Sequence, residues 1–362
     1  MNVGDLVRAM EGIAPSRFAA SWDNVGLLVG DRASPLRSVL LTIDCTAPVL
    51  DEARGGKASA VVAYHPPLFA PQKRFLAGSI AHDAARAGIA VYSPHTALDV
   101  AAGGTNDVIA DAVGLTARAP LRPLDPVEAA VKLVTFVPAE HLAKVSGAVF
   151  AAGAGRIGDY SSCGFRTPGT GTFFGEAGAA PVIGEAGRLE EAAELRFETV
   201  VPLPLVPEVV SALRASHPYE EPAFDLVRLA PAPASAGMGR VGNVHQGPVA
   251  SIVDAVKRGL GLDHVLVAGL VERNVSRVAV CAGSGGDLID DAVASGAEVF
   301  LTGELRHHDA LRATAAGLTV ICTLHSASER AALVALEHRL SAELPGVTVT
   351  RSRLDHEPFA FR

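Results

Sequence analysis

The chain has 362 residues, of which 49% are hydrophobic and 19% charged, and its formal net charge is -8. This length exceeds the size at which a single hydrophobic core usually stops growing, so two or more domains are expected. The composition excludes a disordered chain, and the acidic charge argues against a nucleic-acid-binding protein, which usually carries a basic stripe.

The sequence also bears on the cellular compartment. The N-terminus has no basic region followed by an apolar run, and no apolar stretch reaches the roughly 18 residues of a membrane span. The cysteines lie far apart and form no C-x-x-C pair, which suits a reducing compartment: Cys45, Cys163, Cys281 and Cys322. We therefore expect a cytoplasmic protein without membrane contact.

The first third of the chain alternates short apolar runs with helix-like segments. Strands are predicted at residues 38–43, 60–64 and 90–93, with helices at 47–54 and 79–87 between them. Short buried strands separated by helices are typical of a mostly parallel α/β sheet.

The middle of the chain has a different pattern. Strands are predicted at 131–137, 194–201 and 224–229, and helices at 139–151 and 206–216. One or two strands in the 160s and 170s would complete the β-α-β-β-α-β order of a split βαβ domain.

Proline-rich joints flank this middle segment, at residues 120–126 and 231–237. We therefore predict an inserted α+β domain at 127–232. It would divide an α/β domain into a first half, residues 1–126, and a second half, residues 233–362.

The last third returns to the α/β pattern. Strands are predicted at 277–281, 298–302 and 318–322, and helices at 287–295 and 327–342. The last of these helices is amphipathic, because Leu333, Leu336 and Leu340 recur on one face.

Polar residues follow several of the predicted strands at their carboxyl ends, where open α/β sheets bind ligands. His65 follows the second strand, and His95 and Asp99 follow the third. His325 follows the strand at 318–322, and Glu329 lies four residues later on the same helix face.

Imidazole and carboxylate ligands together favour zinc, iron, manganese or nickel over calcium or magnesium. A bridging carboxylate would allow two ions about 3.5–4 Å apart. The alternative is that each of these residues is a polar side chain with its own separate partner.

Other polar segments leave more than one interpretation open. Asp23 and Asn24 line a pocket or form a turn. Residues 103–107 cap a helix or bind an anion. Residues 283–287 have the position of a phosphate-binding turn but lack the lysine of a P-loop.

A further polar segment follows the strand at 298–302. Glu304, His307 and His308 either reach the same sheet edge, where they would contact ligands or substrate, or are simple surface residues.

Six motifs in order resemble those of the NIF-three-like family, often labelled GTP cyclohydrolase I type 2 homologues: WDNVGLLVG at 22–30, YHPPLF at 64–69, SPHTALD at 93–99, GGTND at 103–107, TGELRHH at 302–308 and HSASE at 325–329. The resemblance implies a two-lobed α/β fold, a toroidal homohexamer and a dinuclear metal site in each subunit. The middle segment is similar to the PII- and CutA-like ferredoxin-like insert of longer members.

The resemblance places the metal ligands on His65, Asp99, His325 and Glu329, with one or two zinc, iron or manganese ions per subunit. One position departs from the family, which usually has two adjacent histidines where this chain has Tyr64 and His65. A neutral phenol is a poor ligand, so either His95 compensates or one metal position is weak or empty.

Two functions remain as hypotheses. In the first, the protein is a metal-dependent hydrolase of a nucleotide-like substrate, similar to GTP cyclohydrolase, in which Glu304 or His308 moves protons and residues 283–286 hold a phosphate. In the second, it is a non-enzymatic metal-binding or regulatory ring whose insert senses an effector. A nucleic-acid clamp is disfavoured by the net charge.

Overall fold

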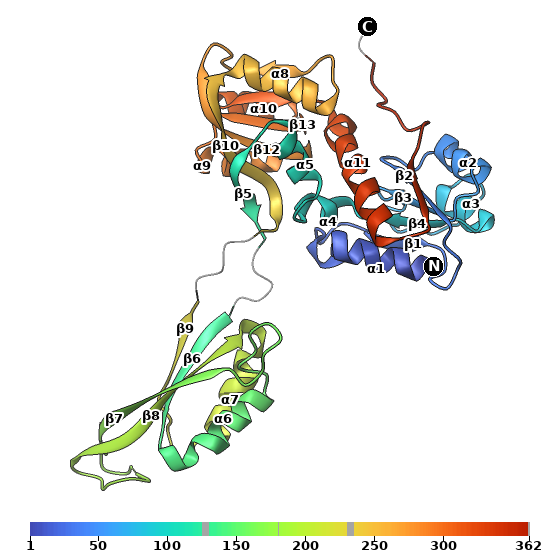
Figure 1. The fold of residues 1–362 in the computed structure, drawn as a ribbon. Helices are drawn as coiled ribbons and strands as arrows, with labels where there is room; N and C mark the ends of the chain where they lie inside the picture. The colour runs from blue at the N-terminus through green and yellow to red at the C-terminus, as the bar shows by residue number, and fades with distance from the viewer. Residues whose placement is uncertain (125–129, 180, 230–234, 361–362) are drawn as a thin grey trace. The chain divides into compact units, whose positions relative to one another are not determined.

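The computed structural model describes residues 1–124, 130–179, 181–229 and 235–360 (Figure 1). Contacts divide the chain into two compact units, one formed by residues 1–124 and 234–362 and the other by residues 125–233. The boundaries predicted at 126/127 and 232/233 lie outside the described residues. The larger unit is therefore built from both ends of the chain.

The larger unit contains two β-sheets. The first has the strand order β1-β4-β3-β2-β15 and is parallel except for β1, which pairs antiparallel with β4. Its strands are β1 Gly26–Val29, β2 Ser38–Thr42, β3 Ala60–Ala63, β4 Ala90–Ser93 and β15 Thr348–Arg351. The parallel sheet predicted for the first third is confirmed, and the structure adds one strand at each edge.

Helices cover both faces of this sheet. They are α1 Val3–Ile13, α2 Ala47–Gly55, α3 Ile80–Ala87 and the long α11 His325–Glu343. Helices α1 and α11 pack with β2, β3 and β4 in one apolar core, and α2 and α3 form a second core on the opposite side chains of the same strands. Because alternate residues of each strand enter different cores, the central strands are apolar throughout.

The second sheet has the order β11-β14-β13-β12-β10-β5, with β12, β13 and β14 parallel and the outer strands antiparallel. Its strands are β5 Thr116–Pro123, β10 Gly237–Pro248, β11 Leu266–Ala268, β12 Asn274–Ser284, β13 Val299–Glu304 and β14 Thr319–Cys322. The three predicted strands of the last third are the parallel ones.

The remaining helices of the larger unit are α4 His95–Val100, α5 Thr105–Ala112, α8 Val249–Leu260, α9 Ile289–Ala294 and α10 His307–Ala315, with 3-10 turns at Ser16–Phe18 and Gly286–Leu288. The helix predicted at 287–295 is thus divided into a 3-10 turn and the short α9. Strands β5, β10 and β11 and helices α4, α8 and α10 were not predicted. Strands β5 and β10 are rich in glycine, proline and polar residues, and they gain their order from pairing with each other and with β12.

Helix α11 joins the two sheets. It contacts β2 and β15 of the first sheet and β12 and β13 of the second, and Figure 1 shows it in red between these two groups of strands. Leu333, Leu336 and Leu340 are buried in the core of the first sheet, as the amphipathic pattern predicted. The helix begins at His325, two residues before its predicted start, which places His325 and Glu329 in its first turns.

The smaller unit has the element order β6-α6-β7-β8-α7-β9 and the sheet order β7-β8-β6-β9, all antiparallel where strands pair. Its elements are β6 Ala130–Val137, α6 Leu142–Ala151, β7 Gly164–Phe174, β8 Leu189–Pro202, α7 Val206–Ser216 and β9 Phe224–Arg228, with 3-10 turns at Ala139–His141 and Leu203–Leu205. This is the predicted split βαβ order, and a single strand, β7, occupies the 160s and 170s.

No helix in the described parts of the chain is both long and apolar enough to cross a membrane.

Candidate metal centre

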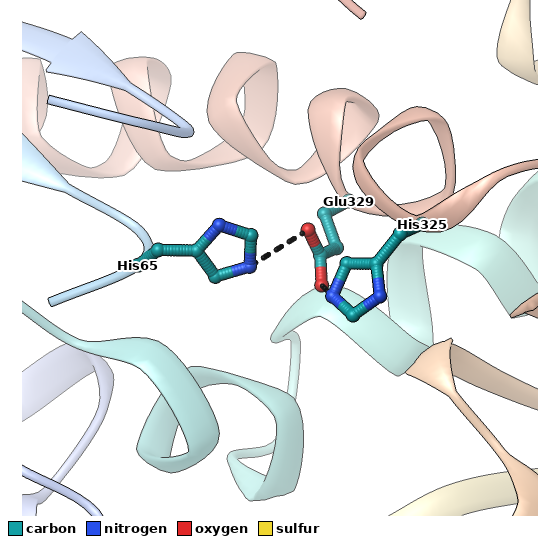
Figure 2. Close-up of side chains that lie close together, drawn as sticks. All are labelled: His65, His325 and Glu329. Carbon is teal, nitrogen blue, oxygen red and sulfur yellow. Dashed lines mark ion pairs between the residues drawn. The ribbon is translucent and has the colours of Figure 1, made fainter. Parts of the chain in front are cut away.

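Three of the four predicted metal ligands come together in the larger unit. His65, His325 and Glu329 each offer a ligand atom, and these atoms all lie within 4.8 Å of one another. Figure 2 shows both imidazoles directed at the Glu329 carboxylate. Its Oε2 lies 3.3 Å from Nε2 of His65, and its Oε1 lies 3.3 Å from Nε2 of His325. The carboxylate therefore stands between the two rings.

His65 is held at the end of β3. Its backbone N–H donates to the carbonyl of Ile43 at 3.0 Å, which extends the pairing of β3 with β2 by one residue beyond Tyr64. Pro66 and Pro67 follow, so the chain cannot continue as a regular central strand. The imidazole therefore projects from the carboxyl edge of the first sheet.

The first two turns of α11 hold the other two residues. Leu324, at the N-cap, has φ of 75°, a conformation that residues other than glycine rarely adopt. Ser328 ties this turn to the second sheet, because its hydroxyl donates to the carbonyl of His325 at 2.6 Å and accepts from the N–H of Gly283 at 2.8 Å. His325 and Glu329, four residues apart, then share one helix face.

Each imidazole of the cluster is oriented by a carboxylate that is hydrogen-bonded to its other nitrogen, Nδ1. Nδ1 of His65 lies 2.9 Å from Oδ1 of Asp44, and Nδ1 of His325 lies 3.0 Å from Oε1 of Glu304. When Nδ1–H donates to a carboxylate, Nε2 of the neutral ring is left with its lone pair, and this is the usual arrangement around metal-binding histidines.

Two of the atoms that face one another at the centre of the cluster lack hydrogen bonds. Both Nε2 of His65 and Oε2 of Glu329 are buried without a hydrogen-bond partner, and Glu329 is only 3% exposed. Buried polar atoms rarely lack a partner, because removing them from water costs free energy that only a new hydrogen bond or a bound ion offsets. Two imidazole nitrogens and a carboxylate are ligands that zinc, iron and manganese accept, so these residues fit a divalent transition metal.

The charges of the cluster follow from its close contacts. Burial acts to lower the pKa of His65, but the hydrogen bond with Asp44 and the contact with Glu329 raise it to about 10. The contact with Glu329 raises the pKa of His325 to about 9. Burial acts to raise the pKa of Glu329, and its contacts with the two imidazoles outweigh burial and lower it. Without a metal, the carboxylate is therefore flanked by two imidazolium ions at neutral pH.

Asp99, the fourth predicted ligand, has a different partner. It lies on α4 and is buried, and its Oδ1 accepts a hydrogen bond from the hydroxyl of Tyr64. The Tyr64 hydroxyl also lies 3.0 Å from Oγ1 of Thr105. Asp99 is not one of the three residues whose ligand atoms come together around Glu329.

Asp99 and Glu329 are nevertheless near enough to influence each other. Burial and the charge of Glu329 raise the pKa of Asp99 to about 6. Burial, together with the charges of Asp99 and Glu329, raises the pKa of Tyr64 well above its ordinary value. Tyr64 is therefore a neutral phenol at physiological pH.

His95 lies beside the cluster. Its ring centroid is 5.4 Å from that of His65 and 6.0 Å from that of Tyr64. Its Nδ1 lies 2.8 Å from Oδ1 of Asp23, so Asp23 orients His95 as Asp44 orients His65. Asp23 also forms a turn, because its N–H donates to the carbonyl of Ala20 at 2.9 Å and its Oδ1 accepts from the N–H of Asn24 at 2.8 Å.

The exposed rings of Trp22 and Phe69 border His95, with centroids 6.1 and 6.5 Å from that of His95. The two aromatic side chains are more than half exposed, at 62% and 54%. They give this side of the cluster an apolar rim.

The predicted proton-transfer residues differ in position. Glu304 ends β13 and bonds His325, and its side chain is 53% exposed. His307 and His308 begin α10, and their rings contact each other with centroids 5.3 Å apart. Among the described residues, Glu304 is the one of these three that bonds a member of the cluster.

The two glycine-rich turns serve structural roles. Gly104 is the N-cap of α5, and Asp107 accepts the N–H of Gly103 at 2.8 Å, so the turn at 103–107 caps a helix. In the turn at 283–287, the N–H of Gly283 donates to Ser328. This group is therefore not available to a phosphate, which weakens the interpretation of that turn as a phosphate site.

One residue of the centre was missed in the sequence. Asp44 follows the strand at 38–43 in the same way that His65 follows its neighbour. The rule that ligands gather beyond the carboxyl ends of parallel strands would have found it.

Comparison with known proteins agrees with this architecture. A model of the family Duf34/NIF3 (NGG1p interacting factor 3) matches residues 1–358. A Mycobacterium leprae protein named GTP cyclohydrolase 1 type 2 homolog is 38% identical over 338 residues, covering 91% of this chain and 87% of that protein. A Bacillus subtilis protein of the same name is 36% identical over 372 residues, covering 100% of this chain and 99% of that protein.

Solved structures are similar over the same length. A Bacillus cereus protein described as related to NIF3 has a TM-score of 0.69 and 34% identity, covering 100% of this chain and 99% of that one. A Staphylococcus aureus protein has a TM-score of 0.79 and 25% identity with the same coverage. With a family model matching nearly every residue and relatives this similar over their whole length, the chain belongs to the Duf34/NIF3 family.

Proposed function

We propose that the chain binds a divalent transition metal through His65, His325 and Glu329 and uses it in a hydrolytic reaction. The observation that carries the proposal is the pairing of each imidazole with a carboxylate on Nδ1, Asp44 for His65 and Glu304 for His325. Two such pairs aimed at one buried carboxylate are the arrangement that metal sites use to fix the tautomer and direction of their histidines.

A divalent ion held by His65, His325 and Glu329 would supply the activation of water that hydrolysis needs. The protein's own part is to keep Nε2 of both rings free for the ion. Glu304 is the candidate for moving protons, because it is exposed to solvent and bonded to a ligand. His308, the other candidate from the sequence, contacts His307 instead.

The substrate class is suggested by the relatives, which are named GTP cyclohydrolase 1 type 2 homologs. We take a nucleotide-like substrate as the first class to screen. The aromatic rim formed by Trp22 and Phe69 suits the planar ring of such a molecule, because aromatic faces stack on one another.

Metal content of the purified protein is the first test. The wild type is compared with His325→Ala/Glu329→Ala and with a control on the same helix, His338→Ala/Glu343→Ala, which leaves the cluster intact. We expect zinc, iron or manganese in the wild type and in the control, and none in the first variant. A folded wild type that retains no divalent metal would refute the site.

The hydrolytic part is tested separately, by incubating the metal-loaded protein with GTP and other nucleotides and following the products chromatographically. Turnover that disappears in the Glu329 variant would support it. Metal binding without turnover of any nucleotide would favour the alternative, a non-enzymatic metal-binding or regulatory protein.

We extend the proposal to assembly and to the insert. The resemblance to the family leads us to expect a homohexamer, which sedimentation equilibrium measures directly. It also leads us to expect an effector-binding role for the PII- or CutA-like insert. An assembly state and metal affinity that respond to no small molecule would count against that role.

A further inference from the structure

Tyr64 and His65 are neighbours in the chain, but their polar atoms contact different carboxylates. Nε2 of His65 lies 3.3 Å from Oε2 of Glu329, whereas the hydroxyl of Tyr64 bonds the carboxylate of Asp99. The end of β3 therefore presents an imidazole nitrogen to one acidic side chain and a hydroxyl donor to the other.

The carboxylates of Asp99 and Glu329 differ in their hydrogen bonding. Both are buried, with Asp99 8% and Glu329 3% exposed. Asp99 accepts the phenol proton of Tyr64, and the same phenol oxygen lies 3.0 Å from the Thr105 hydroxyl. Oε2 of Glu329 has no hydrogen bond. Of the two, only Glu329 combines a carboxylate oxygen that lacks a hydrogen bond with two imidazole nitrogens, each 3.3 Å away, that could share an ion with it.

The chemistry of residue 64 reinforces this difference. Tyr64 is fully buried, and its hydroxyl directs a hydrogen, not a lone pair, towards Asp99. A neutral phenol is both a weak ligand and an occupant of the space that an ion beside Asp99 would need. An imidazole at the same position would instead offer a lone pair beside a carboxylate, which is the ligand chemistry of a transition metal.

Resting on the metal-binding function above, we propose that the hydrogen bond between Tyr64 and Asp99 replaces a second metal ion, so that each chain holds a single divalent cation and Tyr64 is the residue that sets this number. Asp99 is then a hydrogen-bonded structural carboxylate and not a ligand. The substitution Tyr64→His removes the donor, supplies a nitrogen ligand beside Asp99, and creates a second position between Asp99 and Glu329.

Manganese content and electron paramagnetic resonance test the proposal on the full-length chain. Wild type, Tyr64→His and the control Tyr92→Phe, a substitution at another buried tyrosine, are stripped with a chelator, loaded with Mn²⁺ and desalted. We expect one ion per chain and an uncoupled spectrum for the wild type and for Tyr92→Phe. For Tyr64→His we expect two ions and a spectrum of exchange-coupled manganese, since paired ions lie about 3.5–4 Å apart.

Two results would overturn the proposal: two coupled ions in the wild type, or a folded Tyr64→His protein that still binds one. If Tyr64→His does not fold, Asp99→Asn decides. It is expected to retain the single ion with an affinity within about tenfold of the wild type, and a larger loss would identify Asp99 as a ligand. A wild type that binds no ion at all is the distinct result that refutes the metal-binding function itself.

Discussion

The ring centroids of His65 and His325 lie 5.4 Å apart, although His65 follows a strand of the first sheet and His325 begins the helix that follows the second. The edge of the first sheet therefore contributes one imidazole to the cluster, and α11, which contacts both sheets, contributes the other imidazole and the carboxylate between them. A metal at this point would link the two sheets of the larger unit, so metal binding and stability should be coupled.

Removing the metal should consequently lower the thermal stability of the protein. A ligand that binds only the folded state at 100 times its dissociation constant stabilises by about 2.7 kcal/mol. We expect the unfolding midpoint to rise on adding Zn²⁺ or Mn²⁺ and to fall with a chelator, as followed by circular dichroism. Glu329→Gln should respond to neither, and an equal response in that variant would contradict the site.

Metal binding should also release protons. The pKa values of His65 and His325 are raised to about 10 and about 9, so both rings carry a proton at pH 7 that the metal must displace. The affinity should therefore increase as the pH rises from about 6 to 9, with close to two protons released per ion below about pH 8. Calorimetry in buffers of different ionisation enthalpy counts these protons.

The metal-free protein should show the opposite trend in stability. A histidine whose folded pKa is raised contributes stability that is fully present below its unfolded pKa, 6.5, and is lost as the pH rises through the folded value. Chelated protein should thus become less stable between about pH 7 and 10 through these two groups. A metal affinity that does not change with pH would contradict both expectations.

The two carboxylates that bond Nδ1 of the histidines should increase the metal affinity without being ligands themselves. Asp44→Asn and Glu304→Gln retain the shape of each side chain but remove its charge, and the hydrogen bonds concerned measure 2.9 and 3.0 Å. Loss of such a partner typically costs 10–100-fold in metal affinity, so we expect a decrease of roughly this size by competitive titration. Asp51→Asn on the exposed face of α2 is the matched control, and an equal effect there would refute the role.

The strand-end rule predicted His65, His325 and Glu329, because the carboxyl end of a parallel strand fixes where the backbone delivers its next residues. The rule does not fix which way a side chain turns. Asp99 was expected beside the others, but whether it faces an ion or the hydroxyl of Tyr64 depends on packing between α4 and β3 that no local pattern encodes. The hydrogen bond between Glu304 and His325 likewise depends on how β13 packs against α11, which no local pattern encodes.

Ion pairs between residues far apart in the chain could not be predicted from the sequence either. Arg240 is 2% exposed, and its Nε and Nη2 lie 2.9 and 2.7 Å from the two carboxylate oxygens of Asp107. The pair joins β10, which follows the insert, to α5, which precedes it. Strand β10 lacks the apolar run that marks a central strand, so neither the strand nor the pair was predictable.

This buried pair should be a major contributor to stability. Arg240→Ala removes both short hydrogen bonds to Asp107, whose side chain is 16% exposed, and leaves it the more distant Arg118 at 3.7 Å. It also removes donors to the carbonyls of Gly237 and Gly239, each 2.7 Å away. We expect a loss of roughly 3–5 kcal/mol in the free energy of unfolding, measured with denaturant. Arg240→Lys should not restore it, because lysine lacks the planar fork that bonds both oxygens.

Arg54→Ala provides the contrast, since Arg54 pairs with Asp51 on the surface at 3.0 Å. An exposed pair of this kind contributes about 0–1 kcal/mol. Equal losses for the two arginine variants would show that the Arg240 pair is not specially stabilising.

Gly283 should be required for metal binding for reasons of space as well as conformation. It has φ of +62°, and a Cβ at this position would lie 3.0 Å from Oε1 of Glu329 and 3.3 Å from Nε2 of His325. Gly261 has a similar φ, +68°, but nothing within 4 Å of the equivalent Cβ. Alanine at either position adopts a left-handed conformation at a cost of about 1–2 kcal/mol, so both variants should lose stability by similar amounts.

Only Gly283→Ala should also lose metal, because its methyl group presses on the two atoms that face each other in the cluster. We expect its affinity for Zn²⁺ to decrease by more than about tenfold, equivalent to about 1.4 kcal/mol, while Gly261→Ala binds as the wild type does. Thermal unfolding and metal titration of the two variants separate the conformational effect from the steric one. If both variants bind metal equally well, the ion does not lie where Oε1 of Glu329 and Nε2 of His325 meet.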